Sequence, residues 1–170
     1  NVVDASNYVM VELGKPIHTF DAAAVQDGRI IVRRAAAGER LETLDHVERE
    51  LETDTLLIAD PSGPLAIAGV MGGAASEVGE GTTEVVVESA IFDPVSIRRT
   101  AFRYALRSEA SLRFEKGLPH ASALSGADRT AALIVRWAGG RAAVGIVDSQ
   151  PTAPPPALVP FRPGRVSRLL

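Results

Sequence analysis

The sequence predicts an α+β protein whose core is a Greek-key, barrel-like arrangement of about six short strands with flanking helices. Three observations lead to this fold class. Short runs rich in β-branched residues, separated by turn residues, fill the stretch from residue 29 to residue 92. Helical patterns bounded by capping residues occupy residues 4–14 and 93–138. The chain of 170 residues is 46% hydrophobic and 23% charged, an ordinary composition for a globular protein with a core.

The first part of the chain is expected to form one helix, one helical turn and the strands. Asp4 is the expected N-cap of a helix that ends near Leu13, with Gly14 just after it. Asp21 is a second N-cap, for a short turn over residues 22–25. The six strands are expected over residues 29–34, 40–44, 47–51, 56–60, 65–70 and 83–92.

The remaining elements are mainly helical. Asp93 followed by Pro94, Ser108, and Pro119 are the residues expected to begin three helices. Their expected ranges are 93–104, 108–115 and 119–138. A last strand is expected over residues 143–147, and a proline-rich linker follows over residues 151–163.

Residues 1–150 are therefore expected to be one domain, and residues 151–170 to be a linker with the start of the next domain. The chain begins at Asn1 rather than Met, which suggests a piece of a longer protein. The absence of cysteine excludes disulfides, thiolate nucleophiles and thiolate metal sites. No apolar run reaches the roughly 18 residues of a membrane span. The net charge of −3 gives no general affinity for nucleic acid, so such contact would have to be local.

One carboxylate is the most informative residue of the chain. Glu88 lies within the apolar run of residues 85–92, which predicts a buried strand. Burying an unpaired charge costs several kcal/mol, roughly a domain's whole margin of stability. Glu88 therefore pairs either with an arginine of the protein or with a polar group of a ligand. A buried acceptor rejects a ligand that lacks the matching hydroxyl, so Glu88 is suited to select a phenol over a phenyl ring.

Other polar and glycine positions have both a structural and a functional interpretation. Gly69, with the glycines that follow it, allows either a tight turn or close approach of the backbone to a ligand. His18 is either a satisfied core histidine or a residue that orients water. Asn7 is either a surface residue of the first helix or part of a site. Ser108 and Ala110 belong either to a tight turn or to a pocket that needs small side chains.

A basic cluster lies between residues 98 and 116. Its members are Arg98, Arg99, Arg103, Arg107, Arg113 and Lys116. The cluster is either a solvated helix face paired with its own glutamates or a local contact for nucleic acid. No arrangement of histidine and carboxylate residues has the spacing of a metal site.

Five segments in order resemble a known family over roughly residues 1–147. They are residues 1–10, 14–21, 68–73, 88–94 and 108–117. These segments resemble the B3/B4 editing region of bacterial phenylalanyl-tRNA synthetase β subunits, and residues 161–170 resemble the start of the domain that follows it, the B5-like domain.

The resemblance implies an aminoacyl-tRNA synthetase module, cytoplasmic and without membrane association. It implies hydrolysis of tyrosine wrongly esterified to the phenylalanine tRNA, within an (αβ)2 assembly with the α subunit. No cofactor is expected in this fragment, and ATP and magnesium would act in the α subunit. By motif, the catalytic residues would be Asn7, His18 and Ser108. The pocket for the tyrosine would be formed by Gly69, Glu88 and Ala110, with Glu88 accepting the hydroxyl. The alternative is a structural, tRNA-contacting module without hydrolysis.

Overall fold

A computed structural model describes residues 1–149 and 158–169. The helices are α1 (Val2–Leu13), α2 (Pro94–Arg103), α3 (Glu109–Phe114), α4 (Ser122–Ala138) and α5 (Pro163–Leu169). The strands are β1 (His18–Asp21), β2 (Ile31–Arg34), β3 (Arg40–Glu42), β4 (Glu48–Glu50), β5 (Leu56–Ala59), β6 (Pro64–Ile67), β7 (Met71–Gly72) and β8 (Val85–Glu88). Helices and strands are both present in quantity, so the α+β class is confirmed.

The described strands form three antiparallel sheets. One pairs β1 with β8, one has the order β2-β5-β6-β7, and one is the β3-β4 hairpin. A bridge between Thr43 and Gly73 joins the hairpin to the end of β7. The pairing among the described residues does not close a ring of strands, so the Greek-key barrel is not confirmed.

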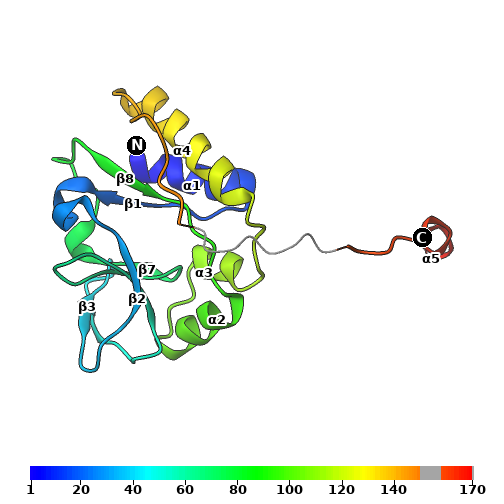
Figure 1. Ribbon diagram of the computed structural model, residues 1–170, viewed down its shortest axis with the longest axis horizontal. Helices are drawn as coiled ribbons and strands as arrows, with labels where there is room; N and C mark the ends of the chain where they lie inside the picture. The colour runs from blue at the N-terminus through cyan, green and yellow to red at the C-terminus, as the bar shows by residue number, and fades with distance from the viewer. Residues whose placement is uncertain (150–157, 170) are drawn as a thin grey trace.

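The sheets and helices enclose two apolar clusters. Figure 1 shows α1 and α4 together beside the β1–β8 pair. Below that pair lie β2, β3 and β7, with α2 and α3 to the right of these strands (Figure 1). A small cluster of Ala5, Val9 and Leu133 joins α1 to α4. The main cluster includes Phe20, Leu57, Ile58, Ile67, Phe92, Ile97 and Phe114. It ties the β1–β8 pair, the four-stranded sheet and the α2–α3 pair into one body.

Three predicted helix caps are confirmed by hydrogen bonds. The backbone N–H of Ser96 donates to Asp93 Oδ1 at 2.7 Å, that of Ser111 to Ser108 Oγ at 3.1 Å, and that of Ala23 to Asp21 Oδ1 at 2.9 Å. Each bond satisfies a donor in the first turn that has no partner within its own helix. These caps fix where α2, α3 and the turn over Ala22–Ala24 begin.

Two predicted helix starts were wrong. The first helix begins at Val2, so Asp4 lies in its first turn, where a negative charge favours the helix dipole. The longest helix begins at Ser122 rather than Pro119. The backbone N–H and the hydroxyl of Ser122 both donate to the Pro119 carbonyl, at 3.0 and 2.7 Å, which closes a separate turn ahead of the helix.

The predicted strand over residues 143–147 was also wrong. This segment has no strand partner, and Val144 and Val147 are fully exposed. A β-branched run forms a strand only where a partner edge accepts its hydrogen bonds. The predicted boundary between residues 150 and 151 and much of the predicted linker lie outside the described residues.

Two predicted strands are shorter than expected, and both changes affect the pocket described below. The strand expected over 83–92 is paired only over 85–88, so Glu88 is its last residue rather than its middle. The strand expected over 65–70 ends at Ile67, and a turn with Gly69 at φ 66° leads into β7. Within residues 1–149 and 158–169, no helix is long and apolar enough to cross a bilayer.

Candidate functional site

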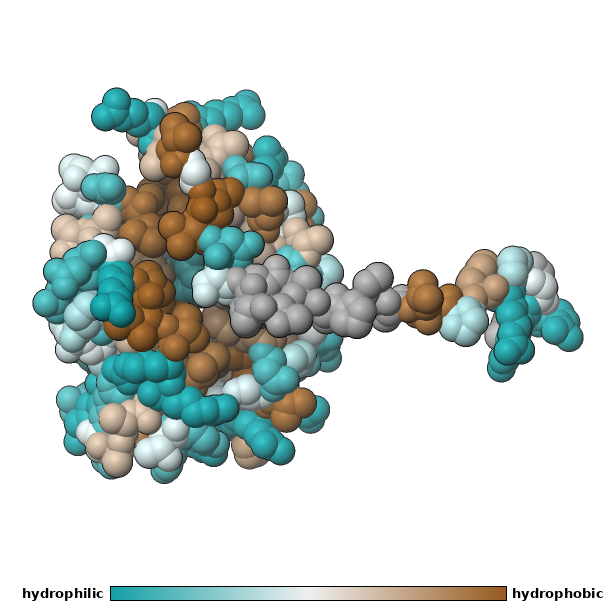
Figure 2. Space-filling view, in the orientation of Figure 1, coloured by the Kyte–Doolittle hydropathy of each residue, from teal (hydrophilic) through white to brown (hydrophobic). Residues whose placement is uncertain are grey.

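A pocket lies where the β1–β8 pair, the β6–β7 turn and α3 meet. Its volume is about 80 Å³, room for roughly three water molecules at about 30 Å³ each. It is lined by Pro16, Ile17, His18, Ile58, Ala66, Ile67, Gly69, Val70, Met71, Gly72, Glu88, Ala110 and Phe114. Figure 2 shows a hollow near the centre of this face of the molecule, bordered by hydrophobic residues.

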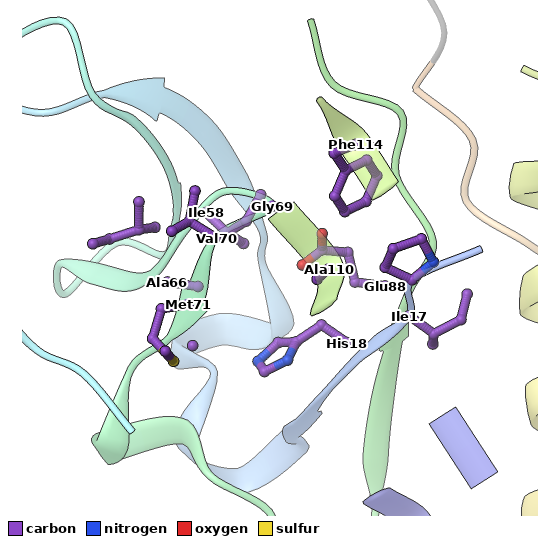
Figure 3. Close-up of a pocket in the computed structure, with 13 residues that line it drawn as sticks. Ile17, His18, Ile58, Ala66, Gly69, Val70, Met71, Glu88, Ala110 and Phe114 are labelled. Atoms are coloured by element: carbon purple, nitrogen blue, oxygen red, sulfur yellow. The ribbon is translucent and has the colours of Figure 1, made fainter. Parts of the chain in front are cut away.

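Strand pairing places the two polar side chains of the pocket opposite each other. In the antiparallel ladder, His18 on β1 is directly across from Glu88 on β8. Residues paired in this way project from the same face of the sheet. The two side chains then diverge, because the Glu88 carboxylate lies beside Ala110 while the His18 ring extends below it toward β7 (Figure 3). An elongated ligand could therefore meet one group at each end.

The Glu88 carboxylate is partly buried and faces the pocket. None of the described residues forms a hydrogen bond or an ion pair within 4 Å with it. Burial raises the pKa of Glu88 to about 7, and the charge of Lys15 acts in the opposite direction. Near neutral pH the carboxylate is thus divided between its two protonation states, and it has acceptor capacity that the protein does not use.

The His18 imidazole is packed against β1 and β7. Its ring makes an edge-to-face contact with Phe20, with centroids 4.5 Å apart. Burial lowers the pKa of His18 to about 4, so the ring is neutral at physiological pH. Within the described part of the chain, its two nitrogens have no hydrogen-bond partner. A neutral imidazole with both nitrogens available can donate one hydrogen bond and accept another.

Helix α3 closes the other side of the pocket. Ala110 lines it, and the ring of Phe114 packs against that of Phe92 with centroids 5.0 Å apart. Ser108, by contrast, is not among the lining residues. Its hydroxyl donates to the Val70 carbonyl at 2.9 Å and accepts from the backbone of α3. Ser108 thus anchors the start of α3 to the pocket wall, and its predicted catalytic role stays a prediction.

Gly69 lines the pocket with its backbone, but its missing side chain would point into the core. A Cβ there would lie 2.7 Å from Phe92 Cδ2, 2.9 Å from Ile97 Cδ1 and 3.1 Å from Phe114 Cδ2. The residue also has φ 66°, in the left-handed region that favours glycine. Gly69 therefore shapes the pocket by letting the turn pack closely on these three side chains.

Asn7 is the predicted site residue that the structure places apart from the pocket. It lies on α1, its side chain is exposed, and it is not among the lining residues. His18, Gly69, Glu88 and Ala110 are brought together in one pocket, whereas Asn7 and Ser108 do not line it. The roles predicted for all six residues stay predictions.

Three residues that shape the pocket were not among the predicted site residues, although Gly72 belongs to the glycine run noted in the sequence. Gly72 leaves room for the histidine, because a Cβ there would lie 2.7 Å from His18 Cε1. Phe114 contributes an apolar wall, and Lys15 lies buried behind it. The glycine run in the sequence was a signal that could have pointed to Gly72 as a pocket residue. The burial of Lys15 had no signal, since lysine is almost never fully buried.

The pocket combines an apolar chamber, an unsatisfied carboxylate and a neutral imidazole. Such a set can hold an aromatic ring, accept a hydrogen bond from its far end and orient a water molecule. Among residues 1–149 and 158–169, no group of three or more histidine and acidic side chains is placed to hold a metal ion.

Comparison with known proteins gives a consistent family. A family model described as the B3/4 domain matches residues 1–139. The phenylalanine–tRNA ligase β subunit of Moorella thermoacetica is 51% identical over 170 residues, which are all of this chain and 21% of that protein. The β subunit of Symbiobacterium thermophilum is 47% identical over 169 residues, 99% of this chain and 19% of that protein. The chain thus spans about a fifth of the length of these curated relatives.

Proposed function

The chain belongs to the B3/4 domain family, and from that premise we propose that its pocket is an editing site. It hydrolyses the ester that joins a wrongly attached tyrosine to the phenylalanine tRNA. The observation that carries the proposal is the Glu88 carboxylate, which has no hydrogen-bond partner among the described residues and faces a mainly apolar pocket. A ring that bears a hydroxyl group gives this carboxylate a hydrogen-bond donor, whereas a phenyl ring leaves it buried without a partner.

The geometry supports a tyrosyl ester lying across the pocket. The ring would occupy the apolar chamber between Val70 and Phe114, with its hydroxyl donating to Glu88. The small side chain of Ala110 leaves space beside the carboxylate (Figure 3). The ester would then lie toward His18, because the imidazole diverges from the carboxylate.

Hydrolysis needs a water molecule held against the ester carbonyl. The water oxygen bonds to that carbon, the bond to the ribose oxygen breaks, and the two water protons end on the amino-acid carboxyl group and the ribose hydroxyl. Because the pKa of His18 is lowered to about 4, its ring is a weak base. We therefore assign His18 the orientation of water, and expect positioning to supply most of the rate.

The direct test is single-turnover hydrolysis of tyrosyl-tRNA(Phe) and phenylalanyl-tRNA(Phe) by the ligase that contains this chain. The proposal predicts rapid loss of the tyrosyl ester alone. His18→Ala should slow that loss by about 10- to 100-fold, at or below the lower edge of the 10²- to 10⁴-fold expected of a general base, because His18 is assigned only the orientation of water. Equal, slow loss of both esters with and without the protein would remove the proposal.

Gly72→Ala is predicted to damage the site more than the fold. The added methyl would meet His18 Cε1 at 2.7 Å and Leu44 Cδ1 at 2.9 Å, so the imidazole would be displaced. We expect tyrosyl-ester hydrolysis to fall at least tenfold, with a loss of about 1–3 kcal/mol in unfolding free energy. Gly79→Ala is the matched control, because nothing lies within 4 Å of a Cβ at that position. Normal hydrolysis by Gly72→Ala would contradict the role of His18.

The remaining context is also part of the proposal. The chain would act within a cytoplasmic phenylalanine–tRNA ligase, as one part of a β subunit that assembles with an α subunit as (αβ)2. The tRNA would bring the ester to the pocket. The editing step itself would need no cofactor, and ATP and magnesium would serve the synthetic site of the α subunit.

A second candidate function, tRNA contact without hydrolysis, is favoured by the exposed face of α2. Three members of the basic cluster are paired: Arg103 with Asp54, Arg107 with Glu115, and Arg113 with Glu109. By contrast, Arg98 and Arg99 are exposed and form no ion pair with any described residue. Phe102, one turn further on, is 84% exposed. Arginines beside an exposed aromatic ring suit the phosphates and bases of a single strand.

Salt dependence tests this second candidate. If α2 contacts tRNA, Arg99→Ala should reduce the slope of log K against log salt concentration by about 0.7–0.9, the value of one phosphate contact. Arg103→Ala is the control on the same helix, because its guanidinium is already held by Asp54. A slope that is the same for wild type and Arg99→Ala would rule out this contact.

A further inference from the structure

Lys15 is a fully buried lysine, with 0% of its surface exposed. Its ammonium donates to the carbonyls of Pro16 and Ala90, and it lies 5.1 Å from the centroid of the Phe114 ring. Helix α4 covers its stem, because Gly126 has no side chain there: a Cβ would lie 2.8 Å from Lys15 Cγ. The fold thus seals this ammonium behind the wall of the pocket.

The immediate contacts of Lys15 do not neutralise its charge. Both hydrogen-bond acceptors are uncharged carbonyls, and no carboxylate of the described residues lies within 4 Å of the ammonium. Burial lowers the pKa of Lys15 to about 8, which means that the site disfavours the charged form. A buried charge without a partner is costly, so it calls for a countercharge nearby.

Glu88 is placed to act as that countercharge. The Ala90 carbonyl held by Lys15 belongs to the same extended segment as Glu88, two residues further on, a separation of about 6.6 Å along the backbone. Phe114, which the ammonium faces, lines the same pocket as the carboxylate. Each group also acts on the other electrostatically, Glu88 favouring the ammonium and Lys15 favouring the carboxylate.

We propose that Lys15 is a positioning residue of the pocket, whose buried ammonium favours the ionised form of Glu88 and holds its strand in place for a phenolic hydroxyl. The coupling of the two groups does not depend on the proposed function. Its consequence for tyrosine selection rests on the proposed function. A carboxylate accepts a stronger hydrogen bond than a neutral carboxyl group, so the ammonium would set the pH range in which the pocket selects a phenol.

The other charged groups around Glu88 do not replace Lys15. His18, across the ladder, is neutral at physiological pH. On β1, the Asp21 carboxylate lies at the far end of the ladder and accepts hydrogen bonds from Ala23 and Thr82. Charged residues of α3 and α4 have partners elsewhere or face solvent: Glu109 pairs with Arg113, Arg129 pairs with Glu12, and Asp128 is exposed.

The first test is the titration of the Glu88 carboxyl carbon by NMR, assigned from the signal missing in Glu88→Gln. Lys15→Met removes the charge and keeps an unbranched apolar stem. It should raise the pKa of Glu88 by about one unit, a tenfold change in the proton dissociation constant. Lys116→Met is the control, because Lys116 is exposed and is the other lysine of the sequence. An unchanged Glu88 titration in Lys15→Met would overturn the proposal.

A reciprocal measurement keeps the test decisive if Lys15→Met does not fold. Linkage requires that removing the charge of Glu88 change the proton affinity of Lys15 by the same factor. In Glu88→Gln the pKa of Lys15 should therefore fall by about one further unit, a tenfold increase in its proton dissociation constant. With two lysines in the sequence, the side-chain signals are easily distinguished. A Lys15 titration identical to that of wild type would also overturn the coupling.

Hydrolysis separates this proposal from the proposed function. If both hold, Lys15→Met should move the midpoint of tyrosyl selectivity to higher pH by the same amount as the pKa of Glu88. Coupled titrations with no selective hydrolysis in wild type would remove the editing function and leave the coupling intact. Selective hydrolysis whose pH midpoint is unmoved in Lys15→Met would remove the positioning role alone.

Discussion

Glu88→Gln is expected to lower the rate of tyrosyl-ester hydrolysis by about 10- to 100-fold. The phenylalanyl ester should keep its slow rate. A hydrogen bond to a charged group contributes about 1.5–3 kcal/mol, and the neutral amide of glutamine provides only part of that. The substitution keeps the size of the side chain, so the volume of the pocket should not change. The measurement is single-turnover hydrolysis of both esters by the ligase containing each variant.

The same variant should lose its pH dependence. Burial raises the pKa of Glu88 to about 7, so the fraction of carboxylate increases between pH 6 and pH 8. Tyrosyl selectivity in wild type should therefore rise over this range, whereas Glu88→Gln should show a flat and low selectivity. Glu84→Gln is the control, since Glu84 is exposed just before the same strand. Equal selectivity in wild type and Glu88→Gln would show that a group other than Glu88 recognises the tyrosine hydroxyl.

Gly69→Ala is expected to destabilise the protein by about 2–5 kcal/mol. Left-handed backbone costs an alanine about 1–2 kcal/mol. The new methyl would also lie 2.7 Å from Phe92 and 2.9 Å from Ile97, two buried side chains with little room to move. Overpacking of this kind adds about 1–3 kcal/mol. Urea unfolding gives the free energy, provided that the slope with denaturant is unchanged.

Gly14→Ala separates the two causes. Gly14 ends α1 at φ 68°, close to the 66° of Gly69, but nothing lies within 4 Å of a Cβ there. Its alanine variant should therefore lose only the backbone part, about 1 kcal/mol. Similar losses for the two variants would mean that the core yields to the methyl at Gly69 without strain.

Features that depend on neighbouring residues could be predicted from the sequence. Asp93 and Ser108 cap the helices that follow them, because each side chain reaches a backbone N–H three residues ahead. The same local logic misplaced the start of α4. Pro119 suits a first helical turn, but Ser122 donates to the Pro119 carbonyl and closes a separate turn, so α4 begins at Ser122.

Features that depend on distant pairing could not be predicted. The apolar run of residues 143–147 has strand propensity but meets no partner edge, so it remains irregular. The register that opposes His18 to Glu88 joins segments 70 residues apart in the chain, and nothing in either segment specifies it. The sequence pattern could therefore suggest His18 and Glu88 as site residues, but not that they lie opposite each other in the folded chain.

The burial of charged side chains could be predicted only in part from the sequence. The sequence pointed to Glu88 because a carboxylate in an apolar run is unusual. Lys15 gave no such signal, since it lies between a helix-ending glycine and a proline, where exposed lysines are common. Its burial follows from the close approach of α4 at Gly126, a contact made only in the folded chain.

The most direct test of the central claim is the binding of two ligands that cannot be hydrolysed, tyrosine and phenylalanine each joined to adenosine through an amide. Calorimetry on wild type and Glu88→Gln would give the four dissociation constants. Recognition of the hydroxyl by Glu88 predicts at least tenfold tighter binding of the tyrosyl ligand to wild type, and no preference in Glu88→Gln. Equal affinity of wild type for both ligands, or a preference that survives in Glu88→Gln, would contradict the claim.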